Sequence, residues 1–182
     1  VCTTGDRPDG LPEMLKDVML GAIDVQVTSG TPSVLNWLLK EAQRQGVSAA
    51  ELSLFVRLPY DTTELVEVNA QLGGYPKVRL FEVDDQQHGT TSTKLAIQRG
   101  RERLVAMLAE GLSIDDACAR LQFRLYLGDD LFLEAARLRA FREAWAAVVD
   151  EFKPRHDCSH TTWIQAVVSY PHEVKSSYDN II

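Results

Sequence analysis

The stretch LQFRLYLGDDLFLEAARLRAFREAW, residues 121–145, contains two hydrophobic periods in succession. Residues 121–127 alternate apolar and polar side chains, which is the period of a β-strand. Large apolar residues then recur at helical spacing: Leu131, Leu138, Phe141 and Trp145. This second pattern predicts a helix over about 131–152. The stretch is therefore one strand–turn–helix unit.

The same alternation runs along most of the chain. Strands are predicted over 22–29, 52–60, 77–83, 121–127 and 162–170. Helices are predicted over 31–46, 61–74, 93–110, 113–120 and 131–152, and another begins near 173. Thr31 and Ser113 are the expected N-caps of two helices, and Asp61 or Thr62 is expected to cap a third. Short connections and alternating elements predict an α/β fold with parallel strands in a single domain, 1–182.

Two arrangements of these units remain open, an open doubly wound sheet or part of a (β/α)₈ barrel. A complete barrel needs about 200 residues or more, so about five strands give only an incomplete one. The sequence contains neither G-x-G-x-x-G after a strand nor a P-loop. The usual signatures of a nucleotide site in a doubly wound sheet are thus missing.

Composition excludes several classes of protein. The formal charge of −7 argues against nucleic-acid binding, which requires concentrated Lys and Arg. No apolar run approaches the roughly 20 residues that cross a bilayer, so no membrane association is expected. The 3 cysteines are widely spaced, which fits a reducing, cytoplasmic compartment. Cys118 is expected to be a small buried hydrophobe.

Polar residues follow the third predicted strand, at the end where parallel folds gather catalytic groups. Glu82, Asp84, Asp85 and His88 occur within EVDDQQHGTT. Carboxylates beside a histidine can exchange protons with a substrate, which makes Asp85 and His88 the candidate catalytic residues. The alternative is a solvated turn in which Asp84 or Asp85 caps the next helix.

Two further strands carry candidate binding residues. Thr28 and Ser29 follow the first strand, where their hydroxyls and a helix N-terminus could receive an anion such as a phosphate or a thioester oxygen. A simple capped turn explains the same residues. Gln165 interrupts the apolar strand WIQAVVSY, and a buried glutamine needs partners. Gln165 either links neighbouring strands through hydrogen bonds or binds a polar ligand in a cavity.

The stretch RHDCSH places His156, Asp157, Cys158 and His160 close together, and these are zinc or copper ligand types. No second cluster with ligand spacing completes a coordination shell. A polar surface loop is therefore preferred, and no metal site is predicted.

The helix in the opening stretch resembles the signature of the methylmalonyl-CoA mutase family, roughly F-x-E-x-A-K/R-x-R-A-x-R-x-x-W. The matching positions are Glu134, Ala136, Arg137, Arg139, Ala140, Arg142 and Trp145. The preceding residues 102–130 are similar to the family in order, and residues 161–182 resemble T-x-x-Q-x-S-G-W-S followed by Y-N-N-I. On the helix, the charged residues are expected to form a salt-bridged wall rather than catalytic machinery.

The resemblance implies a (β/α)₈ barrel that holds an acyl-CoA, and adenosylcobalamin bound by a separate domain through D-x-H-x-x-G. No such motif occurs here, so adenosylcobalamin is implied on a partner chain or a missing domain and not on this chain. Where the family has G-Y-H, this sequence reads Val83, Asp84 and Asp85. The expected arginine for the substrate carboxylate is not found. These departures resemble the non-catalytic small subunit of heterodimeric mutases.

Three functions follow from the resemblance. The first is a catalytically degenerate barrel that supports a mutase large subunit or self-associates. The second is the substrate-binding part of an active acyl-CoA mutase, with His88, Asp85 and Gln165 facing the substrate. The third is a stand-alone module that binds a CoA ester. Five units would also leave parallel edge strands unpaired. Three explanations are open: the chain is a fragment of a longer subunit, another polypeptide completes it, or the units close into an unusual compact form.

Overall fold

Two three-stranded parallel sheets form the centre of this computed structural model, which describes residues 10–60, 64–87 and 90–168. The first sheet contains β1 (Asp24–Val27), β2 (Ser53–Val56) and β3 (Val78–Arg79). The second contains β4 (Phe81–Asp84), β7 (Leu121–Leu127) and β8 (Trp163–Val168). The α/β class and the parallel strands predicted from the sequence are confirmed.

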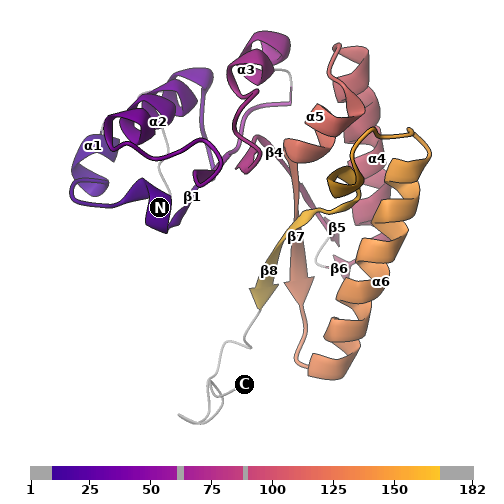
Figure 1. Ribbon diagram of the computed structural model, residues 1–182. Coiled ribbons are helices and arrows are strands. Elements are labelled where there is room, and N and C mark those ends of the chain that lie inside the picture. Colours follow the sequence, from indigo (N-terminus) through magenta and orange to yellow (C-terminus); the bar gives the residue numbers. More distant parts are fainter. Residues whose placement is uncertain (1–9, 61–63, 88–89, 169–182) are drawn as a thin grey trace, which may run out of the picture.

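Helices follow the strands in the order expected for βα units. They are α1 (Leu11–Met14), α2 (Pro32–Arg44), α3 (Leu65–Gln71), α4 (Thr93–Ala109), α5 (Ile114–Ala119) and α6 (Leu131–Asp150). Two short 3₁₀ turns, η1 (Leu20–Ala22) and η2 (Asp157–His160), complete the connections. In Figure 1, α4 and α6 run beside the strands β7 and β8, and α2 lies over β1.

The third predicted strand is divided in two at Leu80. The backbone N–H groups of Leu80 and Phe81 both donate to the carbonyl of Arg120, at 2.8 and 3.0 Å. The carbonyl of Leu80 accepts from the N–H of Leu58, two residues after the end of β2, at 2.9 Å. Leu80 therefore connects β3 in the first sheet to β4 in the second. The prediction of one continuous strand over 77–83 was wrong. Two successive N–H groups donate to the same carbonyl of Arg120, which interrupts the regular ladder of hydrogen bonds at Leu80.

The strands lie in sequence order within each sheet, β1-β2-β3 and β4-β7-β8. A doubly wound sheet reverses this order at a switch point, and the described strands show no such reversal. The order fits consecutive βα units of the barrel type. Among the described residues, β1 and β8 each pair with a single strand, so the sheets remain open.

Predicted boundaries hold best where local chemistry marks them. β7 matches its predicted range, and Thr31 and Ser113 cap α2 and α5, with Thr31 Oγ1 accepting from the N–H of Val34 at 3.4 Å. Of the helix predicted over 61–74, the structure describes Leu65–Gln71, preceded by Glu64, which makes no side-chain cap. Asp61 and Thr62, the expected caps, lie outside the described residues. The predicted loop before α4 also contains a small antiparallel pair, β5 (Gln86–Gln87) with β6 (Thr90–Thr91).

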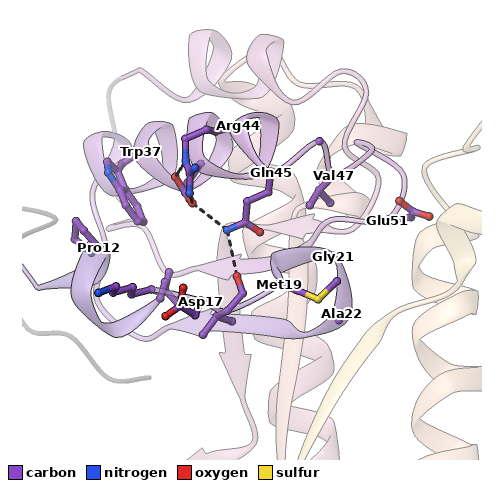
Figure 2. A pocket seen from close by; sticks show the side chains of 15 residues that line it. Pro12, Asp17, Met19, Gly21, Ala22, Trp37, Arg44, Gln45, Val47 and Glu51 are labelled. Atoms are coloured by element: carbon purple, nitrogen blue, oxygen red, sulfur yellow. Dashed lines mark hydrogen bonds and ion pairs between the residues drawn. The ribbon is translucent and has the colours of Figure 1, made fainter.

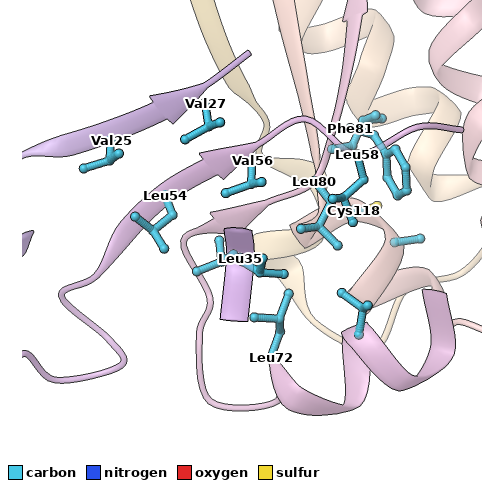
Figure 3. Packing of buried hydrophobic residues seen from close by; sticks show 14 of the residues in the cluster. Val25, Val27, Leu35, Leu54, Val56, Leu58, Leu72, Leu80, Phe81 and Cys118 are labelled. Atoms are coloured by element: carbon cyan, nitrogen blue, oxygen red, sulfur yellow. The ribbon is translucent and has the colours of Figure 1, made fainter. Parts of the chain in front are cut away.

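One hydrophobic cluster spans both sheets. Figure 3 shows it extending from Val25 and Val27 on β1, through Leu54 and Val56 on β2, to Leu80 and Phe81. Because the cluster is continuous across the division at Leu80, the two sheets share one core. Cys118 belongs to this cluster, as predicted, and burial raises the pKa of its thiol to about 12.

Aromatic packing holds α4 and α6 against the second sheet. The ring of Phe123 on β7 meets those of Phe141 and Trp145 on α6 edge-on, at centroid distances of 4.8 and 4.7 Å. Gly100 of α4 lies over the same rings, and a Cβ added there would stand 2.7 Å from both Phe123 and Trp145. Glycine at 100 therefore allows the close approach of helix and sheet.

No helix within 10–60, 64–87 and 90–168 is long and apolar enough to cross a membrane.

Candidate functional site

A charged side chain lies at the centre of the face of the second sheet that is turned away from α4 and α6, called here the inner face. The Glu82 carboxylate is fully buried and forms an ion pair with Arg57 through Oε1. The same oxygen lies 3.4 Å from Nη1 of Arg124, and Oε2 accepts from Nε2 of Gln122 at 2.8 Å. Gln165 joins this set through Arg124. We call these five residues the Glu82 network.

The register of the strands explains why the Glu82 network assembles. Glu82 of β4 is paired with Gln122 of β7, and Arg124 of β7 is paired with Gln165 of β8. Alternate residues of a strand point to the same face, so residues two apart on adjacent strands meet there. Arg57 reaches Glu82 from the end of β2. A buried carboxylate is tolerated here because arginines and an amide satisfy it.

Gln165, for which the sequence predicted a buried glutamine with partners, is only half-buried but does have a partner. Its Oε1 accepts from Nε of Arg124 at 3.1 Å, which ties β8 to β7. Of the two interpretations, this contact favours a tie between strands. A substrate-binding role for Gln165 stays a prediction.

Asp85, the candidate catalytic carboxylate, is completely buried at the end of β4. Oδ1 accepts from the backbone N–H of Tyr126 at 3.1 Å, and Oδ2 pairs with Nη1 of Arg137 at 2.8 Å. Asp85 thus fastens the end of β7 and the first turns of α6 to β4. Its partner in the prediction, His88, lies outside the described residues, and the catalytic role of both stays a prediction.

The signature helix forms a salt-bridged wall at Glu134 and Arg137, as the sequence predicted. Arg137 donates to Glu134 at 2.7 Å and to the carbonyl of Tyr126 at 2.5 Å, and Glu134 accepts from the N–H of Gly128 at 3.1 Å. Burial lowers the pKa of Arg137, but the bonds to Asp85 and Glu134 outweigh it and raise that pKa. The other two arginines of the signature, Arg139 and Arg142, are exposed.

Thr28 and Ser29 lie in the bend between β1 and α2, with Thr28 half-buried and Ser29 exposed. The next residue, Gly30, donates its N–H to the carbonyl of Arg57 at 2.9 Å, while the N–H of Arg57 donates to Val27. Arg57 therefore connects this bend to the Glu82 network. Binding of an anion by Thr28 and Ser29 stays a prediction.

The loop RHDCSH is fastened to α5 by one carboxylate. Asp115 accepts from the backbone of Arg155 and His156 at 3.2 and 3.3 Å, and from Oγ of Ser159 at 2.6 Å. These contacts hold the pKa of Asp115 below its ordinary value. In the part of the chain that the structure describes, no three His, Cys, Asp or Glu side chains are arranged to hold a metal ion.

A cavity of about 770 Å³ opens on the outside of the molecule, between α1, η1 and α2. Figure 2 shows Gln45 reaching across it, where its amide donates to the carbonyl of Val18 at 3.1 Å and to Glu41 at 2.9 Å. Gln45 also accepts from the N–H of Leu20 at 3.0 Å. None of the residues predicted to bind or react lines this cavity, and its central amide is already paired.

Arg57, Gln122 and Arg124 are the members of the Glu82 network that sequence reasoning missed. The signal for Arg124 was available, because the alternation in 121–127 places Gln122, Arg124 and Tyr126 on one face of the strand. Arg57 carried no comparable signal, since its role depends on Glu82, which is 25 residues further along the chain.

Comparisons with known proteins agree on one family. The family model described as methylmalonyl-CoA mutase matches residues 83–181. A probable methylmalonyl-CoA mutase small subunit of Mycobacterium tuberculosis (strain ATCC 25618 / H37Rv) is 30% identical over 167 residues, covering 81% of this chain and 27% of that protein. The methylmalonyl-CoA mutase small subunit of Propionibacterium freudenreichii subsp. shermanii is 27% identical over 165 residues, covering 80% of this chain and 26% of that protein.

A shorter segment is more similar to a further relative. The methylmalonyl-CoA mutase of Rhizobium meliloti (strain 1021) is 49% identical over 55 residues, which cover 30% of this chain and 8% of that protein. The chain thus spans about a quarter of the length of the small subunits it matches, and less of this mutase.

Proposed function

The chain belongs to the methylmalonyl-CoA mutase family, and from this premise we propose that it is a small-subunit-type barrel component that supports a cobalamin-dependent acyl-CoA isomerase without catalysing the reaction. The relatives that match about four-fifths of the chain are named small subunits, which implies a large-subunit partner. Consecutive parallel βα units without an order reversal support a barrel segment.

The Glu82 network is the observation that carries this proposal. An acyl-CoA running along a barrel axis would need room beside the inner face of the strands. Here the long side chains of Arg57 and Arg124 converge on the Glu82 carboxylate across that face. Separating them to admit a ligand would leave a fully buried carboxylate unpaired, which costs about 3–5 kcal/mol. The network therefore favours a structural wall over a substrate channel.

The donor set of the described residues does not fit adenosylcobalamin. The ring nitrogens of His160 are engaged by the carbonyl of Asp157 at 3.1 Å and by the Asp150 carboxylate at 3.3 Å. His156 lies in the loop that Asp115 fastens to α5. We accordingly propose that adenosylcobalamin is bound by a partner chain or a further domain.

The open sheet edges give this chain a structural reason to associate. β1 and β8 each pair with one strand in the described residues, and Trp163 and Val168 on β8 are 43% and 49% exposed. Exposed edges of parallel strands carry unpaired N–H and C=O groups. Further βα units, a large subunit or a second copy would cover them. A cytoplasmic location, expected from the cysteines, stays a prediction.

Co-expression with a cobalamin-carrying mutase large subunit tests the proposal. We expect the two chains to co-purify in stoichiometric amounts. Adenosylcobalamin-dependent turnover by the complex should be unchanged when Gln165→Ala is introduced into this chain. Failure to co-purify at stoichiometric level would count against a small-subunit role.

An active mutase fragment is the second candidate, because the segment 49% identical to the Rhizobium meliloti protein matches a mutase not named as a small subunit. His88, Asp85 and Gln165 would then face the substrate, with Thr28 and Ser29 at an oxygen of the thioester. Turnover that falls on His88→Ala, with an unchanged circular dichroism spectrum, would favour this candidate. Tight CoA-ester binding by the chain alone, without turnover, would instead favour a binding module.

A further inference from the structure

The first turn of α6 exposes three successive apolar side chains. Leu131, Phe132 and Leu133 are 61%, 86% and 63% exposed, and Phe132 is the most exposed large apolar residue among those described. Helical spacing predicts that Leu131 shares the apolar face of Phe141 and Trp145, yet most of its side chain is exposed. A run of three exposed apolar residues is a liability in a folded protein unless it serves a contact. We call these three residues the α6 tip.

The α6 tip is held in a defined place by the bonds around it. Asp130 caps the helix by accepting from the N–H of Leu133 at 2.9 Å. One turn later, Arg137 pairs with the buried Asp85 at 2.8 Å. The exposure therefore belongs to a fastened helix start and not to a loose end. Apolar groups on a preorganised backbone lose less conformational entropy when they bind a partner.

The α6 tip lies at the open side of the second sheet. Residues 128–130 separate it from the end of β7, where Leu127 is paired in register with Val168 at the end of β8. Among the described residues, β8 pairs only with β7, so its other edge is open, and Val168 is 49% exposed. Figure 1 shows the start of α6 beyond the ends of these two strands. A partner that covers the tip can therefore also reach the edge of β8.

The charges beside the α6 tip indicate the kind of partner. Asp129 and Asp130 directly precede the tip and are both exposed, whereas the exposed Arg139 and Arg142 lie about two turns further along the helix. Two copies that met tip to tip would bring the aspartates together, and the formal charge of −7 also opposes self-association. The complementary surface is an apolar pocket whose rim carries lysine or arginine.

We propose that the α6 tip docks into such a pocket on the mutase large subunit, with Phe132 as the central anchor. Aromatic side chains are enriched in the cores of interfaces, where a few buried anchors carry most of the binding energy. This surface rests on the proposed small-subunit function, which supplies the partner. It is separate from the Glu82 network, which lies on the inner face of the sheet.

Titration of the full chain against a cobalamin-carrying large subunit tests the surface. Phe132→Asp should weaken binding about 10-fold or more, because it places a charge in an apolar pocket. Met19→Asp is the matched control and should bind as the unchanged chain does, since Met19 is 73% exposed but precedes η1, away from α6. The thermal midpoint of Phe132→Asp alone should equal that of the unchanged chain. A variant that unfolds would show that the chain itself covers the tip, which would overturn the proposal.

Asp129→Lys tests the basic rim of the pocket. The variant should bind about 3-fold or more weakly at low ionic strength, because it replaces attraction by repulsion. The difference from the unchanged chain should shrink in about 1 M sodium chloride, where exposed charges are screened. Tighter binding by Asp129→Lys would contradict a basic rim.

The outcomes separate this surface from the function on which it rests. Equal binding by Phe132→Asp and the unchanged chain would overturn the surface and leave the small-subunit function intact. An unchanged chain that does not bind the large subunit would overturn both. Sedimentation of the chain alone should show a monomer. A dimer that Phe132→Asp dissociates would assign the tip to a second copy and overturn docking on the large subunit.

Discussion

The two faces of the second sheet are built on opposite principles. Toward α4 and α6, Phe123 meets Phe141 and Trp145 in an apolar layer so close that only a glycine fits at position 100. On the inner face, Arg57 and Arg124 surround the carboxylate of Glu82. The first face is stabilised by removal of apolar surface from water, and the second by compensation of charge.

This difference between the two faces indicates which substitutions each face tolerates. Apolar packing is non-directional, and similar side chains can replace one another if the volume is kept. A buried ion pair stabilises the fold only while both partners are present. When one partner is removed, the other charge stays buried without compensation, which costs free energy. The helix-facing side therefore depends on packed volume, while the inner face depends on charge pairing. Predictions that alter one face at a time separate these two roles.

Glu82→Ala should have the largest effect. It leaves Arg57 and Arg124 facing each other without their shared carboxylate, and the expected loss of unfolding free energy is about 3 kcal/mol. This value lies at the lower end for a buried pair because Arg57 is 40% exposed and can turn toward water. Urea denaturation followed by circular dichroism measures it.

The triple variant Glu82→Met, Arg57→Met, Arg124→Met supplies the control for that prediction. Replacing the whole set by apolar side chains of similar length should restore stability to within about 1 kcal/mol of the original or exceed it. A triple variant as unstable as Glu82→Ala would show that the inner face depends on side-chain shape rather than on charge compensation.

Gly100→Ala should have the next largest effect and tests the opposite face. The new methyl would lie 2.7 Å from the rings of Phe123 and Trp145, and such overpacking costs about 1–3 kcal/mol. The higher helix propensity of alanine offsets up to about 1 kcal/mol of this. A net loss of about 1–2 kcal/mol is expected from thermal denaturation.

Phe123→Leu introduced together with Gly100→Ala provides the matched test. The smaller side chain makes room for the methyl, so the double variant should lose less than the sum of the two single losses. Strictly additive losses would contradict the assigned contact.

Asp24→Asn should have the smallest effect, because Asp24 lies at the edge of the first sheet with its side chain 37% exposed. Burial opposes its ionisation, but hydrogen bonds from Gln26 and Ser53 and the charge of Arg79 hold its pKa below 3.8. The stability it adds is present above pH 3.8 and is lost as the pH falls through the lower folded-state pKa.

At pH 7 the loss on Asp24→Asn should be below about 1 kcal/mol, since the Asp24 side chain is 37% exposed and asparagine keeps an oxygen that can accept from Arg79. The midpoint of urea denaturation, measured from pH 6 down to about pH 2, should fall less steeply in the variant than in the unchanged chain. Parallel curves for the two proteins would show that Asp24 adds no pH-dependent stability.

Local sequence signals predicted the elements and some of their ends. The period-two pattern in LQFRLYL gave the range of β7 directly, and Thr31 and Ser113 marked two helix starts because a side-chain cap is a local interaction. The division of the third strand at Leu80 carried no such mark. It depends on the carbonyl of Arg120, which lies 40 residues away in the chain.

In the candidate site, too, the sequence predicted individual residues but not their distant partners. The sequence pointed to Asp85 and Gln165 as polar residues on strands, and the structure places both next to Arg124, whose carbonyl accepts from Asp85 and whose side chain donates to Gln165. The pairing of Asp85 with Arg137 joins residues 52 positions apart. Composition and periodicity do not report partners at that separation.

By itself, the sequence determined the α/β class, the parallel units and the family, since these rest on periodicity and on the identity of residues in one helix. Only the tertiary structure showed that the Glu82 carboxylate is buried between Arg57 and Arg124, and that Nε and Nη2 of Arg103 have no hydrogen-bond partner among the described residues. The physical reason is that burial and charge compensation arise between strands and helices distant in the chain, so the meaning of a charged residue depends on what the fold places opposite it.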